Sequence, residues 1–153
     1  MNVIEEIKNL LDKNNISYKI FEHEPTPTSE IAAKVRGTPL ERGAKALVLR
    51  SEGNFLMCVL PANRKLSFRK VKEIIRSRKL SFATPEEVKK VTNCVVGGVP
   101  PFGNLFNIPL YIDKNLLNNE TIDFNAGLQT VSIEIGSKDL VRTSRGILMD
   151  ITE

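Results

Sequence analysis

One stretch of the sequence has residue types that suit binding of an oxygen-rich group. Residues 94–103 read Cys-Val-Val-Gly-Gly-Val-Pro-Pro-Phe-Gly. The glycines can adopt positive φ and let a ligand approach the backbone, whereas the prolines fix φ and donate no hydrogen bond. A loop of this kind can present bare backbone N–H groups to a ligand. A strand that runs into a tight surface turn also explains the composition.

A second candidate is Lys45, which lies in the apolar run 43–49. A lysine in such a run usually lies on an exposed face or extends its amine to solvent. If it points into a pocket instead, it supplies a fixed positive charge for a carbonyl, phosphate or ribose oxygen. The backbone amides of Gly97 and Gly98 would then complement it in an oxyanion-type site.

The sequence offers little for other catalytic mechanisms. The only histidine, His23, lies next to a Pro-rich break and is interpreted as a surface or loop-packing residue. No Cys/His cluster is present, so we expect no metal site and no cofactor. Asp113, Asp123 and Glu134 leave a paired-carboxylate hydrolase open, although their spacing does not bring two of them together in sequence.

The composition is that of an ordinary globular protein. The 153 residues are 41% hydrophobic and 26% charged, which fits one domain, 1–153, with a substantial core. No apolar run approaches the length of a membrane span, and the acidic start lacks signal-peptide features, so we expect a cytoplasmic protein. Cys58 and Cys94 lie in apolar runs that we interpret as buried strands, and we expect free thiols.

Positive charge is concentrated in residues 64–79, although the net charge is only +4. Such a block can attract a phosphate backbone, and its simpler explanation is a solvated helix face. The residues of this block that could contact such a backbone are Arg64, Lys65, Arg69, Lys70 and Arg76.

Hydrophobic spacing and cap residues predict mixed helices and strands. The expected helices are 2–13, one capped by Thr28 or Ser29 that ends near Arg36, a basic one capped by Ser67, and 85–91 after the capping box 84–87. The expected strands are 16–21, 43–50, 55–60, 80–83, 110–113, 121–127, 131–135 and 147–150, with a turn or short helix at 137–140. Because these elements do not alternate as βαβ units, we expect an α+β fold. It would have a mixed, largely antiparallel sheet, curled or forming a partial barrel, with flanking helices.

Three sequence motifs follow one another along the chain. They are the lysine run 43–49, the glycine–proline stretch 96–103, and Phe-Asn-Ala-Gly at 124–127. Together they resemble the YbaK/ProX family of aminoacyl-tRNA deacylases, which is related to the editing domain inserted in bacterial prolyl-tRNA synthetases. The likeness covers nearly the whole chain. It implies a YbaK-like mixed α/β fold around a curled sheet, hydrolysis of the ester between a mischarged amino acid and tRNA, and no metal.

The resemblance also assigns roles by position. It makes Lys45 the essential lysine and places Gly97 and Gly98 in the catalytic loop. The residues that it implies bind the substrate are Val99, Pro100, Pro101, Phe102, Gly103, Asn125, Ala126 and Gly127. A histidine that follows the later segment in some members has no counterpart here, because Gln129 occupies that neighbourhood.

We therefore expect a trans-editing hydrolase for mischarged tRNA, with Ala-tRNA(Pro) or Cys-tRNA(Pro) as its substrate. The partner is then the aminoacylated end of tRNA, and prolyl-tRNA synthetase is a candidate second partner. Two alternatives stay open. One is a non-catalytic tRNA- or nucleotide-binding module of the same fold, and the other is a small-molecule esterase that does not require tRNA.

Overall fold

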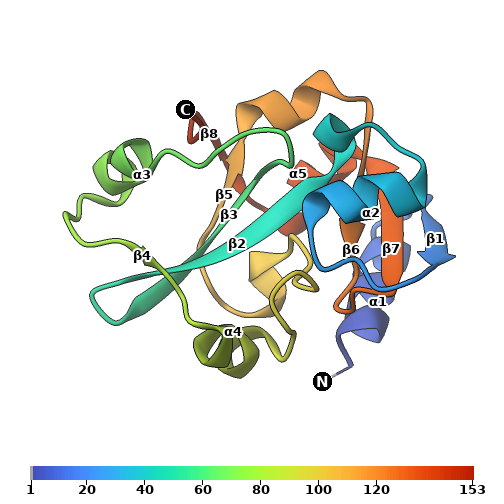
Figure 1. Cartoon of the computed structure of the whole chain (residues 1–153), viewed down its shortest axis with the longest axis horizontal. Helices are drawn as coiled ribbons and strands as arrows, with labels where there is room; N and C mark the ends of the chain where they lie inside the picture. Colours follow the sequence, from blue (N-terminus) through green and yellow to red (C-terminus); the bar gives the residue numbers. More distant parts are fainter. Residues whose placement is uncertain (1) are drawn as a thin grey trace.

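The computed structural model describes residues 2–153 and arranges them as two sheets with helices around them (Figure 1). The five-stranded sheet has the order β4-β2-β3-β5-β8, and the three-stranded sheet has the order β1-β7-β6. The helices are α1 (Val3–Lys13), α2 (Ser29–Arg36), α3 (Phe68–Ile75), α4 (Pro85–Thr92) and α5 (Ser137–Ser144). The strands are β1 (Lys19–Glu22), β2 (Ala44–Ser51), β3 (Asn54–Pro61), β4 (Ser81–Phe82), β5 (Leu110–Asp113), β6 (Thr121–Asn125), β7 (Val131–Gly136) and β8 (Ile147–Met149).

The larger sheet is built on the β2–β3 hairpin. Its turn has positive φ at both Glu52 and Gly53, as a type I′ turn requires. β3 pairs antiparallel with β2 but parallel with β5, and β5 pairs parallel with β8. The smaller sheet is antiparallel throughout. The expected mixed α/β fold is therefore confirmed, but residues 2–153 form two sheets rather than one, and neither closes into a barrel.

The core lies on both faces of β3, which explains its continuous apolar sequence. Met57 and Val59 face the main cluster, which also contains α1 and the smaller sheet. Leu56, Cys58 and Leu60 face a second cluster beneath α3. The alternation follows from the two-residue period of a strand, with both faces covered as predicted for 55–60.

The helix ends follow the expected cap signals. Thr28 accepts a hydrogen bond from the Ile31 N–H, and Ser67 accepts one from the Lys70 N–H. Thr84 and Glu87 form the reciprocal capping box at the start of α4. The predicted turn or short helix at 137–140 is the start of α5. Within residues 2–153, no helix is both long and apolar enough to cross a membrane.

One predicted strand is wrong. Cys94 is buried and its thiol is free, but the residues that follow it form a loop rather than a strand. Asn93 adopts a left-handed conformation at the end of α4, with φ 59°, and the chain enters a turn directly afterwards. Val95 and Val96 are consequently half exposed.

The two sheets meet beside the residues of interest. An isolated parallel bridge joins Gly43, just before β2, to Asp123 in β6. Lys45 and Asn125 each lie two residues further along their strands, so they extend from neighbouring positions at this junction.

Candidate active site

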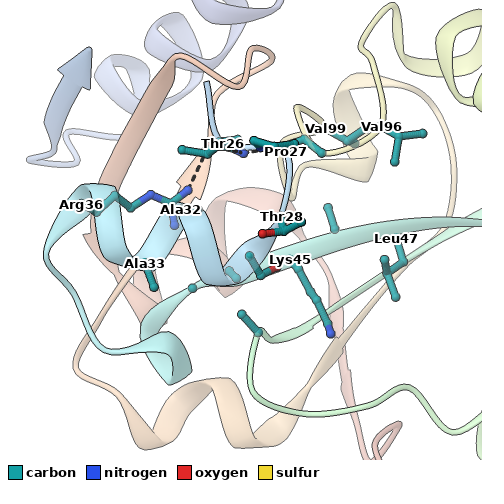
Figure 2. A pocket seen from close by; sticks show the side chains of 17 residues that line it. Thr26, Pro27, Thr28, Ala32, Ala33, Arg36, Lys45, Leu47, Val96 and Val99 are labelled. Carbon is teal, nitrogen blue, oxygen red and sulfur yellow. Dashed lines mark hydrogen bonds between the residues drawn. The ribbon is translucent and has the colours of Figure 1, made fainter. Parts of the chain in front are cut away.

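A cavity of about 280 Å³ lies where the start of α2, the start of β2 and the glycine loop (residues 95–99) come together (Figure 2). Much of its wall is made of small residues, and these leave the space open. They are Ala32, Ala33, Gly43, Ala44, Ala46 and Ala62. The polar part of the wall includes Thr28, Ser29 and Lys45. Such a cavity suits a small apolar group joined to a polar or charged one.

Lys45 supplies an available positive charge to this cavity. Its ammonium makes no ion pair or hydrogen bond within residues 2–153. Partial burial lowers the pKa of Lys45, and the negative charge of Glu30 opposes that shift. Figure 2 shows the amine directed away from Val96 and Val99, so Lys45 and the glycine loop occupy different walls. A ligand that fills the cavity can contact both.

The glycine loop contains a tight turn. Gly97 has φ 87°, and the Gly98 N–H donates to Val95 O at 2.9 Å, the pattern of a type II turn. A side chain at Gly98 would place its Cβ 3.1 Å from the Gly127 carbonyl oxygen. The Gly98 N–H is therefore committed to the turn, whereas the Gly97 N–H has no partner within residues 2–153.

The structure brings together four of the residues assigned from the resemblance. Lys45, Gly97, Val99 and Asn125 line the cavity. The others lie outside its lining and are buried: Gly98, Pro100, Pro101, Phe102, Gly103, Ala126 and Gly127. Their assigned contact with substrate stays a prediction.

Phe102 is the clearest of these buried residues. Its side chain is fully buried, and its ring packs edge-to-face on Phe124 with the centroids 5.5 Å apart. The environment of Phe102 is therefore that of a core residue, which supports the loop from behind.

Sequence reasoning missed several residues that line the cavity. The sequence assigns Thr28 and Ser29 to a helix cap and Arg36 to the end of the same helix, but it gives none of them, nor Thr26 or Ala62, a role in the site. Arg36 had no signal in the sequence because its partner Asp123 lies 87 positions away.

The carboxylates do not form a free catalytic pair. Asp123 and Glu134 are cross-strand partners, so the sheet register brings together two residues that spacing alone could not. Each is paired with an arginine, Asp123 with Arg36 and Glu134 with Arg42. Burial raises the pKa of Asp123, and the charge of Arg36 opposes that shift. Asp113 is also buried, and it accepts the backbone N–H of Ile151 at 3.1 Å. These carboxylates are therefore structural in this fold.

His23 joins the same polar network. Its Nδ1 lies 2.8 Å from the Glu24 carbonyl oxygen, which can only accept a hydrogen bond. Its Nε2 lies 2.6 Å from the hydroxyl of Ser132. Because a carbonyl oxygen only accepts, Nδ1 is the donor in the contact with Glu24. His23 is thus a loop-packing residue, as predicted.

Comparison with known proteins fits this geometry. The model of the aminoacyl-tRNA editing domain family matches residues 23–143. This chain belongs to that family. It is 30% identical to the multifunctional Ser/Thr-tRNA deacylase ProXp-y of Escherichia coli, over 92% of this chain and 87% of that protein. It is 27% identical to the prolyl-tRNA editing protein ProX of Acetoanaerobium sticklandii, over 85% of this chain and 83% of that protein.

A solved structure shares the fold of this editing domain. That structure is described as a candidate trans-editing enzyme for prolyl tRNA synthetase. The two structures superimpose with a TM-score of 0.87 and 25% sequence identity, and the match covers 100% of this chain and 98% of that one. The predicted family is confirmed, and the chain is an aminoacyl-tRNA deacylase, a hydrolytic editing enzyme. The alternatives of a binding module and a tRNA-independent esterase therefore lose their support.

Proposed function

We propose that this editing domain acts in trans, in the cytoplasm, and hydrolyses the ester between a small amino acid and the 3′ end of tRNA. The observation that carries the proposal is that one cavity is lined by both the half-buried Lys45 and Gly97, and that neither the Lys45 amine nor the Gly97 N–H has a hydrogen-bond partner within residues 2–153. In this proposal the Gly97 N–H stabilises the negative charge that develops on the ester carbonyl oxygen as water attacks. Lys45 anchors the terminal adenosine or its phosphate. The neighbouring ribose hydroxyl of the substrate assists the water, as the family resemblance implies.

The cavity wall supports a small amino acid, and we propose alanine or cysteine carried on tRNA(Pro). The side chains of Ala32, Ala33 and Ala46 give this part of the wall an apolar surface, which suits the side chain of alanine or cysteine. An apolar pocket separates substrates by only about 1–3 kcal/mol per methylene, so a separate hydrolytic site is the physical reason for such an enzyme. ProX is named for prolyl-tRNA editing and ProXp-y for Ser/Thr-tRNA, so serine and threonine are the competing substrates to test.

A panel of charged tRNAs tests the substrate. We expect Ala-tRNA(Pro) or Cys-tRNA(Pro) to be hydrolysed at least about tenfold faster than Pro-, Ser- or Thr-tRNA(Pro). Ala33→Leu, which fills the cavity, should slow the reaction, whereas Val35→Leu on the exposed face of the same helix should not. Fastest hydrolysis of Thr- or Pro-tRNA(Pro) would rule out a pocket limited to alanine or cysteine.

We also propose that the basic block binds the acceptor end of tRNA. The chain passes from Ala62 in the cavity wall through Arg64 and Lys65 to α3, where Arg69 and Arg76 line a shallow groove. Lys70 should contribute least, because its amine already donates to Asp150 Oδ1 at 2.9 Å and to Thr152 O at 2.7 Å. This contact instead attaches α3 to the C-terminal residues.

The salt dependence of tRNA binding tests this surface. Arg64→Ala/Arg76→Ala should raise KM at low salt and reduce the slope of log affinity against log salt by about one unit per lost phosphate contact. kcat should stay unchanged, because neither side chain lines the cavity. Lys13→Ala/Lys19→Ala removes the same charge from α1 and β1 and is the matched control. Equal effects of the two pairs would exclude a defined RNA surface on α3.

A further inference from the structure

We propose that Asn125 and Gln129 are positioning residues that clamp the glycine loop by its carbonyl oxygens and so aim the Gly97 N–H at the substrate. The inference rests on the proposed function, because the direction of this N–H matters for catalysis only if it binds the ester carbonyl. It assigns Asn125 a role different from direct contact with substrate, and it gives Gln129 a role in the site.

Three successive carbonyl groups of the loop are held by one neighbouring segment, residues 125–129. The Val96 oxygen accepts from Gln129 Nε2 at 3.1 Å, and the Gly97 oxygen accepts from Asn125 Nδ2. The Gly98 oxygen accepts from the Gly127 N–H at 2.8 Å. Because Val95, Val96 and Gly97 are exposed and outside any strand, these contacts and the turn hydrogen bond from the Gly98 N–H to Val95 O hold the loop in place.

The contact from Gln129 has a direct consequence for the catalytic N–H. The Val96 carbonyl and the Gly97 N–H belong to one planar trans peptide unit, so they point in opposite directions. A hydrogen bond that holds the carbonyl toward Gln129 therefore turns the N–H away from Gln129. Val96 and Gly97 line the cavity whereas Gln129 does not, so in this proposal the Gly97 N–H faces the cavity.

The orientation of Asn125 is itself fixed by Arg36. The Arg36 side chain is only 7% exposed, and its guanidinium donates to Ser132 Oγ at 2.8 Å and to Asn125 Oδ1 at 2.9 Å, besides its ion pair with Asp123. Arginine has donors only, so the amide oxygen of Asn125 must face it. The NH₂ group of Asn125 then faces Gly97, whose carbonyl can only accept. The sheet junction is thus connected to the loop through one amide side chain.

Isosteric variants test the clamp without enlarging or filling any space. Asn125→Asp retains an acceptor for Arg36 but loses the donor to Gly97, and Gln129→Glu loses the donor to Val96. We expect each to lower kcat at least about tenfold, because a misplaced oxyanion donor loses much of its effect. KM for the tRNA should change less than about twofold, because the contacts that we assign to tRNA lie elsewhere.

Asn14→Asp is the matched control. It removes an equivalent contact between an Asn amide and a backbone carbonyl, from Asn14 to Leu10 O at 2.8 Å, at the end of α1. This variant should keep the wild-type kcat. The hydrogen bond from Gln129 to Val96 is exposed, so Gln129→Glu should fold normally. This variant therefore tests the clamp even if Asn125→Asp folds poorly.

Glycine-selective ¹⁵N labelling supplies a readout that a general loss of structure would not mimic. The chain has 9 glycines, so the amide spectrum is simple. In both clamp variants the Gly97 signal should move while that of Gly53, in the distant hairpin turn, stays in place. Wild-type kcat in both variants, or a raised KM with unchanged kcat, would overturn the clamp. An inactive wild-type protein would instead overturn the proposed function.

Discussion

Lys45→Ala is expected to lower kcat/KM for deacylation of mischarged tRNA by about 100-fold or more, the size of effect seen when a charged or oxyanion-stabilising group is removed from an active site. The reason is that the Lys45 ammonium is the cavity's one cation without a protein partner within residues 2–153. Lys34→Ala, an exposed change on α2, is the control and should have no effect. Equal rates for Lys45→Ala and the wild type would remove Lys45 from the mechanism.

The same residue gives a pH dependence with a definite sign. Desolvation lowers the pKa of Lys45, so its positive charge is lost at lower pH than for an exposed lysine. After subtraction of the uncatalysed rate, activity should fall as the pH rises through this lowered pKa. Glu30→Gln should shift the fall to still lower pH, because the Glu30 charge favours the ammonium form. A fall at unchanged pH in Glu30→Gln would show that another group titrates.

Phe102→Ala is expected to lower the free energy of unfolding by about 3–5 kcal/mol, the usual cost of deleting a buried aromatic ring. The Phe102 ring is fully buried and packs on Phe124 behind the glycine loop. Urea unfolding measures the loss. Phe82→Ala should cost much less, because Phe82 is 55% exposed.

A milder change at this position separates a core role from contact with substrate. Phe102→Leu keeps an apolar side chain, so the folded protein should retain kcat/KM within about threefold of the wild type, since volume-conserving core changes are well tolerated. A stable Phe102→Leu protein with a strongly raised KM would instead support the contact with substrate that the family resemblance implies.

Local signals in the sequence predicted most of the elements correctly. The capping box at Thr84 and Glu87 and the cap at Thr28 act over a few residues, so they can be read from neighbouring positions. Lys45 was also identifiable, since a charged residue in an apolar strand is unusual.

The errors concern features that depend on distant residues or on exposure. Val95 and Val96 have β-branched side chains, which are typical of strands. They are half exposed because Asn93 adopts a left-handed conformation and the chain turns at Gly97. The division into two sheets depends on how β6 approaches β2, at the bridge from Gly43 to Asp123. No local pattern encodes that approach.

The site shows the same division between local and long-range information. The motifs in the sequence identify Lys45 and the glycine loop as candidate catalytic groups. They do not predict the long-range contacts of Arg36 with Asp123 and Asn125 that hold the site together. A buried arginine is recognised only when its partners are placed beside it.

A crystal structure with a non-hydrolysable substrate mimic would show whether the ester carbonyl of the substrate lies at Gly97 and its adenosine at Lys45. A suitable mimic is 3′-amino-3′-deoxyadenosine with alanine attached through an amide bond in place of the ester. We predict that its alanyl group lies among Ala32, Ala33 and Ala46, with its carbonyl oxygen within hydrogen-bond distance of the Gly97 N–H and its adenosine portion in contact with Lys45. A mimic bound outside the cavity, or with its carbonyl turned away from Gly97, would contradict the account.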